Sequence, residues 1–235
     1  WSGALSLTTV CPMSLPAAAN APTPFRDLPS LVAEHARHRP QATALVVGDQ
    51  RLSYATLDAL ADRVAAGLQR DGLQPGERVA VCATSCPAYV AVYLGTLRAG
   101  GAVAPLAPSS TAEQLVGMAV DADARRFFLD AGVADALAAA GVTVPADLPV
   151  TRLEAIDAWL PPEGTQPAPV AIDPAWPFNL IYSSGTTGTP KGIVQSHAMR
   201  WGHIQRAAIS GYGTDTVTLI ATPLYSNTTL VSVIP

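Results

Sequence analysis

The chain has 235 residues, of which 49% are hydrophobic and 14% are charged, and its formal net charge is −4. This composition is typical of a globular protein with a large buried core. The acidic balance, with no basic stripe interleaved with aromatic residues, argues against a nucleic-acid-binding surface. The most apolar stretch, residues 90–107, is interrupted by Arg98 and Pro105, so the sequence predicts no membrane span.

The first 24 residues differ in composition from the rest. Residues 16–24 are rich in alanine and proline, which predicts a disordered, extended tail over residues 1–24. Because the chain starts at Trp1 and its first methionine is Met13, we expect residues 1–12 to lie outside the native coding sequence. No positive charge precedes an apolar run there, so no secretory signal is expected.

Helix and strand signals alternate from Phe25 onward. Ser53 is expected to cap a helix that ends at Gly72, and residues 144–173 are proline-rich and predict an irregular connection. Further helices are predicted at 28–39, 88–97, 111–120 and 133–140, and strands at 44–47, 78–81, 102–106 and 126–129. Strands that alternate with helices of this length indicate βαβ units and a mostly parallel sheet in an α/β fold.

The three cysteines offer no metal site. Cys11, Cys82 and Cys86 form no C-x-x-C pair, and no histidine lies near Cys82 or Cys86 in the sequence. We expect buried or unreactive thiols in a reducing, cytoplasmic setting.

The most informative segment is Tyr182-Ser183-Ser184-Gly185-Thr186-Thr187-Gly188-Thr189-Pro190-Lys191-Gly192. It lies between the apolar runs 177–181 and 193–195, which predicts a loop joining two short strands. The glycines let the backbone turn sharply and bring its N–H groups close to a ligand, and the hydroxyls add rotatable donors. Lys191 adds a positive charge. Together these groups predict a loop that binds the phosphates of a nucleotide.

Other interpretations of the loop explain less of it. It is not a Walker loop, because Gly192 rather than serine or threonine follows Lys191, and it lacks the G-x-G-x-x-G of a dinucleotide-binding turn. A flexible Ser/Gly turn is the remaining alternative. Such a turn would not need Pro190 and Lys191 beside the hydroxyls.

At these residues the chain resembles the phosphate-loop signature of adenylate-forming (AMP-binding) enzymes, which include acyl-CoA synthetases, peptide-synthetase adenylation domains and luciferases. The likeness extends over roughly residues 25–235, with less specific blocks at 53–57, 72–80 and 100–108. It implies stacked, mostly parallel sheets with flanking helices. It also implies that residues 25–235 are a truncated N-terminal adenylation domain that lacks the C-terminal lid domain.

The resemblance also implies a reaction. ATP and Mg²⁺ activate a carboxylic acid to an acyl-adenylate, and coenzyme A commonly accepts the acyl group. Lys191 and Thr187 would be catalytic, and no metal ligand is identified. The nucleotide-binding residues would be Ser183, Ser184, Gly185, Thr186, Thr187, Gly188, Thr189 and Lys191. We expect this piece alone to be unable to complete adenylation.

A second candidate segment follows a predicted strand at residues 217–221. Residues 222–227 are similar to the family's Pro-Leu-aromatic-His segment, which lines the acyl pocket, so Tyr225, Ser226 and Asn227 would bind the substrate. Ser226 stands where a histidine is usual, and Asn227 could take over a hydrogen-bonding role. The alternative is that these residues only turn a strand into a helix.

Histidines add little. His197 begins a predicted helix, where a packing or helix-terminus role is favoured over nucleotide binding, and His35 and His38 are expected to be solvated. An acid–CoA ligase is the leading assignment, with a peptide-synthetase adenylation domain or a luciferase-like enzyme as alternatives. A non-catalytic nucleotide-binding or interaction module is the rival from another class. The acid, the acceptor and the oligomeric state stay open.

Overall fold

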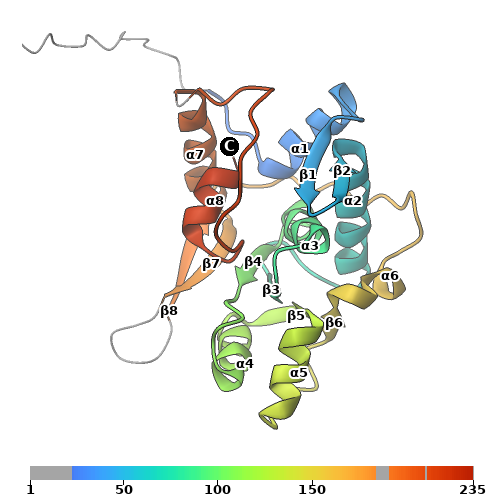
Figure 1. Ribbon diagram of the computed structural model, residues 1–235, viewed down its shortest axis with the longest axis vertical. Coiled ribbons are helices and arrows are strands. Elements are labelled where there is room, and N and C mark those ends of the chain that lie inside the picture. The colour runs from blue at the N-terminus through green and yellow to red at the C-terminus, as the bar shows by residue number, and fades with distance from the viewer. Residues whose placement is uncertain (1–22, 184–190, 210, 235) are drawn as a thin grey trace, which may run out of the picture.

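The computed structural model describes residues 23–183, 191–209 and 211–234. Their main element is a six-stranded sheet with the order β6-β5-β3-β4-β7-β8 (Figure 1). Its strands are β3 (Arg78–Cys82), β4 (Ala102–Pro105), β5 (Ala124–Leu129), β6 (Val150–Arg152), β7 (Pro177–Ser183) and β8 (Lys191–Ser196). Neighbouring strands run parallel except β7 and β8, which are antiparallel. The predicted α/β fold with a mostly parallel sheet is confirmed.

Helices cover both faces of this sheet. The described helices are α1 (Leu28–His38), α2 (Tyr54–Arg70), α3 (Pro87–Arg98), α4 (Ala112–Asp121), α5 (Ala131–Ala139), α6 (Ile156–Trp159), α7 (His197–Ile209) and α8 (Asn227–Val233). Side chains alternate along β3, so Val79 and Val81 pack with α2 and α3, whereas Ala80 and Cys82 pack with α4 and α5. The two resulting cores explain why β3 reads as an uninterrupted apolar run.

Local signals account for several element boundaries. Ser53 caps α2 as predicted, because its Oγ accepts a hydrogen bond from the N–H of Thr56 at 3.2 Å. A short strand that was not predicted, β2 (Gln50–Ser53), pairs with β1 (Thr43–Val47) across a turn in which Gly48 has a φ of 58°. The predicted irregular stretch at 144–173 also contains β6 and α6, which are too short to produce a periodic pattern.

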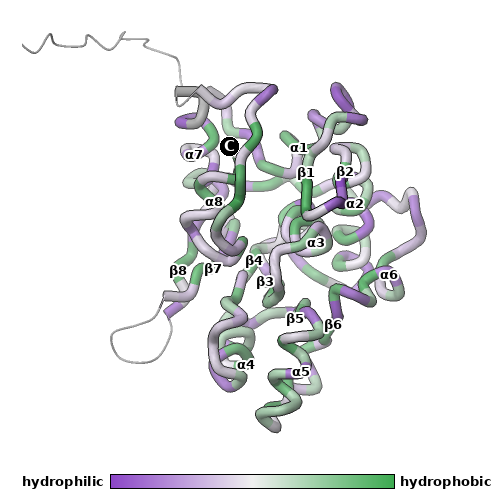
Figure 2. Tube along the Cα trace, viewed as in Figure 1, coloured by the Kyte–Doolittle hydropathy of each residue, from purple (hydrophilic) through white to green (hydrophobic). Residues whose placement is uncertain are grey.

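The strand predicted at residues 217–221 is wrong. These residues have no regular secondary structure, and Val217 and Leu219 are 94% and 89% exposed. Figure 2 shows this hydrophobic stretch beside the C-terminus. Within the described residues no neighbouring strand supplies the hydrogen bonds that a β-strand requires, so the apolar pattern alone does not form one.

The described thiols are buried or partly buried and unpaired. Burial raises the pKa of Cys82 to about 12, so this thiol stays protonated at neutral pH. Cys11 lies outside the described residues. None of the helices in the described part of the chain is long and apolar enough to cross a bilayer.

His197 anchors the start of α7 inside the protein. Its side chain is 1% exposed, and its ring meets the ring of Phe178 edge-on with the centroids 5.1 Å apart. The backbone N–H groups of His197 and Ala198 donate to the carbonyls of Trp176 and Pro174. Burial lowers the pKa of His197 from 6.5 to about 4, so the imidazole is neutral at neutral pH. The structure therefore gives this histidine a packing role.

This burial predicts a pH-dependent stability. Between pH 6.5 and pH 4 the unfolded chain binds a proton at His197 that the folded chain does not, so the free energy of unfolding falls as the pH falls. A shift of this size corresponds to a loss of about 3 kcal/mol. Urea unfolding at pH 7.5, 6 and 4.5 measures the loss, and His197→Gln, which does not titrate, should remove it. An equal pH slope in both proteins would show that other groups are responsible.

Candidate nucleotide and acid site

The two described ends of the predicted phosphate loop face each other across a hairpin. β7 ends at Ser183 and β8 begins at Lys191, and these two residues are paired in the β7–β8 ladder. The two short strands predicted on either side of the loop are confirmed. The remaining predicted nucleotide-binding residues lie outside the described residues: Ser184, Gly185, Thr186, Thr187, Gly188 and Thr189.

The position of the hairpin in the sheet fits a ligand-binding role. Val103 of β4 pairs in parallel with Asn179 of β7, so Tyr182 and Ser183 extend past the end of β4 at Pro105. Ligands of open α/β sheets bind outside the carboxyl ends of the parallel strands. Ser183 therefore lies at the edge of the sheet where open α/β sheets bind their ligands.

Lys191 is available to an anion. It is the only lysine in the chain, and its side chain is exposed at the first position of β8. Ser183, its partner across the hairpin, is exposed as well. Among the described residues no carboxylate forms an ion pair with Lys191, so its charge is not neutralised there. An exposed ammonium group with no described carboxylate partner is suited to phosphate oxygens.

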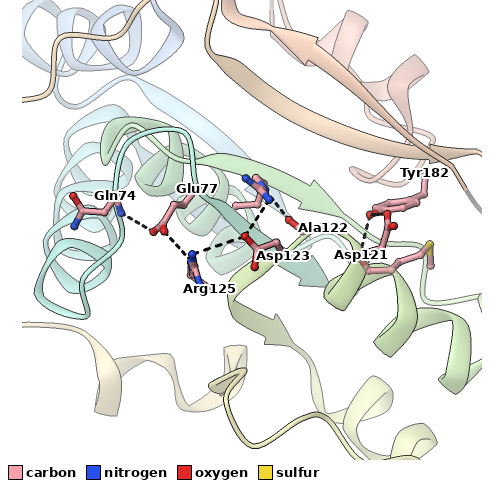
Figure 3. A network of polar contacts seen from close by, with 9 residues as sticks. Gln74, Glu77, Asp121, Ala122, Asp123, Arg125 and Tyr182 are labelled. Atoms are coloured by element: carbon pink, nitrogen blue, oxygen red, sulfur yellow. Dashed lines mark hydrogen bonds and ion pairs between the residues drawn. The ribbon is translucent and has the colours of Figure 1, made fainter.

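Tyr182 fixes the C-terminal end of β7 in place. Its hydroxyl donates to Oδ2 of Asp121 at 2.7 Å and lies 3.0 Å from the carbonyl oxygen of Met118, both in the last turns of α4 (Figure 3). Burial and the hydrogen bond to Asp121 raise the pKa of Tyr182. Gly192 lies across the strand pair from this ring, and a Cβ at that position would come within 3.3 Å of it. The base of the loop is therefore fixed to α4.

The same corner of the molecule carries a chain of ion pairs. Asp123 pairs with Arg78 and Arg125, and Arg125 also pairs with Glu77 (Figure 3). Arg78 additionally donates to the carbonyl oxygen of Ala122 at 2.6 Å. These contacts tie the end of α4 to β3 and β5, so the helix that receives Tyr182 is itself held to the sheet.

The predicted acid-binding segment lies against the loop that follows β3. The N–H of Leu224 donates to Oγ of Ser85 at 3.2 Å, and Leu224 is buried. Tyr225, Ser226 and Asn227 follow and are partly buried. Ser226 occupies the N-cap position of α8, but its side chain makes no capping hydrogen bond. The side chain of Ser226 is therefore not committed to the helix end.

Asn227 makes the contact that links this segment to the hairpin. Its Oδ1 accepts a hydrogen bond from Nη2 of Arg200, which lies on α7, at 2.9 Å. The structure thus brings Asn227 to the strands that flank the phosphate loop, whereas Tyr225 and Ser226 make no side-chain hydrogen bond to described residues. Sequence reasoning missed Arg200 and Ser85, and it included Tyr182 in the loop segment without giving it an anchoring role. Of these residues, only Arg200 could have been noticed in the sequence, because it is a charged residue among the apolar residues Met199, Trp201 and Ile204.

Comparison with known proteins identifies the family. Residues 32–235 match the family model described as "AMP-binding enzyme". The chain belongs to this family.

Relatives of the AMP-binding enzyme family align with most of this chain. The "Isonitrile lipopeptide synthase" of Mycobacterium tuberculosis is 33% identical over 180 residues, which cover 76% of this chain and 7% of that protein. The "Fatty acid--[acyl-carrier-protein] ligase ScoC" of Streptomyces coeruleorubidus is 31% identical over 167 residues, which cover 69% of this chain and 31% of that protein. The chain therefore spans less than a third of either relative.

A solved member of the family has the same fold. The nonribosomal peptide synthetase FmoA3 superposes with a TM-score of 0.79 at 25% identity, over 91% of this chain and 22% of that chain. FmoA3 has also been solved in an AMPPNP-bound form. The expected architecture of an adenylate-forming enzyme is confirmed.

The anchor at Tyr182 predicts a measurable loss of stability. Tyr182→Phe keeps the ring against Gly192 but removes the hydrogen bond to the Asp121 carboxylate, so we expect the free energy of unfolding to fall by about 1–2 kcal/mol. Urea unfolding measures it. Tyr212→Phe is the matched control, because Tyr212 is 37% exposed and makes no hydrogen bond to described residues. Equal stability of the two variants would contradict the anchoring role.

Proposed function

We propose that the protein carrying this sequence activates a carboxylic acid with ATP and Mg²⁺, forming an acyl-adenylate and pyrophosphate. The family match over residues 32–235 carries the proposal. The hairpin supports it, because Ser183 and Lys191 meet at the mouth of a loop rich in glycine and hydroxyl groups. FmoA3, which binds the ATP analogue AMPPNP, supports ATP as the nucleotide.

The described residues fit the phosphate end of this nucleotide. ATP supplies the α-phosphorus that the carboxylate of the acid attacks. Lys191 offers a positive charge that no described carboxylate pairs with, and the two strands that flank the loop are paired with each other. Preorganised donors aimed at developing negative charge contribute about 3–4 kcal/mol each to lowering a barrier. In this proposal Lys191 either neutralises the departing pyrophosphate or tethers the loop.

The acid meets the nucleotide beside Tyr225, Ser226 and Asn227 in this proposal. Leu224 contacts Ser85 and Asn227 contacts Arg200, so the segment is held between the loop after β3 and the base of the hairpin. Ser226 cannot supply the imidazole that the family usually has at this position. Asn227 is the side chain of this segment with a defined orientation.

A pantetheine thiol is the proposed acceptor of the acyl group. Coenzyme A is the acceptor that the sequence first indicated. A carrier protein is the second candidate, favoured by relatives named as a lipopeptide synthase and a fatty acid–[acyl-carrier-protein] ligase. Both acceptors present the same thiol, and the acyl-adenylate formed in the first half-reaction is the same whichever of them receives the acyl group.

Lys191 provides the test of the adenylation step. In the intact protein, ATP–pyrophosphate exchange with a panel of acids should fall about 100-fold in Lys191→Ala, because a charge that stabilises the transition state is lost. Lys191→Arg keeps the charge and should retain more activity. Exchange that is unchanged in Lys191→Ala would remove Lys191 from the mechanism.

Because Lys191 is the only lysine, binding has a second and independent readout. An amine-directed reagent labels Lys191 and the chain's amino terminus, and mass spectrometry separates the two products. Saturating Mg²⁺–ATP should slow the labelling of Lys191 while the amino terminus serves as the internal control. Equal labelling with and without nucleotide, together with no exchange for any acid, would favour a non-catalytic module.

The acceptor is tested separately. The acyl-adenylate formed by the intact protein should be consumed when the correct thiol is added. Coenzyme A and a phosphopantetheinylated carrier protein are compared at equal concentration, and thioester is detected by mass spectrometry. Thioester on the carrier alone would overturn the assignment as an acid–CoA ligase, and thioester on coenzyme A would support it.

A further inference from the structure

We infer that Arg200 is a positioning residue that orients Asn227, so that the Nδ2 amino group of Asn227 is the donor offered to a carboxylate oxygen of the acid. The inference rests on the proposed function. It adds a specific hydrogen bond for recognition of the substrate and names the residue that orients the group making it.

One nitrogen atom of Arg200 joins the elements of the site. Nη2 lies within hydrogen-bonding distance of three amide oxygens, Oδ1 of Asn227 at 2.9 Å, Oδ1 of Asn179 at 3.2 Å and Oε1 of Gln195. Because Nη2 carries two hydrogens, one of them is shared between two of these oxygens. Asn179 and Gln195 are paired partners in β7 and β8, and Asn227 is the first residue of α8. The guanidinium therefore connects both strands of the hairpin with the acid-binding segment.

The charge of Arg200 is buried. The side chain is 1% exposed, and its guanidinium carbon lies 5.6 Å from the centre of the Phe178 ring. Among the described residues no carboxylate forms an ion pair with Arg200. A buried charge is tolerated only when it is hydrogen-bonded, and a guanidinium keeps its charge throughout the physiological range. Nε of Arg200 has no partner among the described residues, and Nη1 lies 3.4 Å from Nδ1 of His203, so the amide oxygens around Nη2 are the main acceptors for this charge.

This requirement determines the orientation of the Asn227 amide. A guanidinium has donors and no acceptor, so an amide beside it must turn its oxygen toward it. With Oδ1 of Asn227 directed at Arg200, Nδ2 is left as a donor, and it makes no hydrogen bond to described residues. Asn227 is partly buried rather than enclosed, so a ligand can reach it. A donor in this segment is complementary to the oxygen of a carboxylate.

Because Arg200 lies far from the phosphate loop, we expect substitutions at Arg200 or Asn227 to change binding of the acid and not binding of ATP. Arg200 contacts the hairpin at the Asn179–Gln195 pair, whereas the loop begins at the Ser183–Lys191 pair. At about 3.3 Å per residue along a strand, these pairs are roughly 13 Å apart. The loop also has its own anchor at Tyr182. Changes at Arg200 or Asn227 should therefore affect the KM for the acid and leave the KM for ATP nearly unchanged.

Asn227→Asp in the intact protein is the decisive variant. An aspartate keeps an oxygen on Arg200 and preserves the size of the side chain, but it has no N–H to donate. We expect the KM for the acid to rise about tenfold, the KM for ATP to stay within about twofold, and the melting temperature not to fall. Arg200→Met should also raise the KM for the acid, because the amide of Asn227 is then free to turn.

Asn179→Asp is the matched control. It places the same new carboxylate on the same guanidinium nitrogen, and the Nδ2 of Asn179 that it removes is buried without a partner. The KM for the acid should stay within about twofold of the parent value in this variant. An unchanged KM in Asn227→Asp, or an equal rise in Asn179→Asp, would overturn the inference.

Hydrogen exchange tests the positioning without substrate. Loss of the guanidinium in Arg200→Met should speed amide exchange in residues 222–233 about tenfold, and Asn227→Asp should leave it unchanged. Equal exchange in Arg200→Met and the parent would overturn the inference even in an active enzyme. If the parent forms no adenylate with any acid, the proposed function fails, and the exchange result still decides whether Arg200 positions this segment.

Discussion

The pairing of β7 with its two neighbours is the constraint on which the candidate site depends. Parallel pairing with β4 directs the end of β7 to the ligand-binding side of the sheet, and antiparallel pairing with β8 brings Lys191 back opposite Ser183. If the two strands were not paired, the residues at the two ends of the loop would have no fixed position relative to each other. Joining two chain segments by a loop does not by itself orient their side chains. The register of the hairpin thus places Ser183 and Lys191 opposite each other at the two ends of the loop.

Two anchors of different chemistry hold this hairpin. Near the loop, the neutral hydroxyl of Tyr182 donates to the Asp121 carboxylate at the end of α4. Farther from the loop, the Nη2 atom of the charged Arg200 guanidinium contacts amide oxygens, and Arg200 has no described carboxylate partner. The first anchor lies at the surface of the sheet, and removing it lowers the free energy of unfolding by about the contribution of one hydrogen bond. The second is buried, so it constrains every amide that it contacts.

Burial keeps two side chains of the fold, His197 and Cys82, in single protonation states at neutral pH. His197 is neutral at neutral pH because its pKa is lowered to about 4, and Cys82 is protonated because its pKa is raised to about 12. Neither side chain is poised to exchange a proton with a substrate at neutral pH. Electrostatic stabilisation and orientation by fixed donors are the contributions that the described residues can make, and they are suited to the attack of a carboxylate on a phosphate.

The sequence by itself determined the α/β class, the family resemblance and the position of the phosphate loop, because these depend on local patterns: apolar periodicity, capping at Ser53, and a run of glycines and hydroxyls before Lys191. The sequence-based prediction was wrong at residues 217–221, where an apolar run has no neighbouring strand to pair with. It also missed β2 and β6, because these strands are too short to show an alternating hydrophobic pattern. It could not show that Arg200 meets Asn227, Asn179 and Gln195, or that Tyr182 reaches Asp121. Those contacts join residues far apart in the chain, and only the packing of α7, α8 and α4 against the sheet decides them.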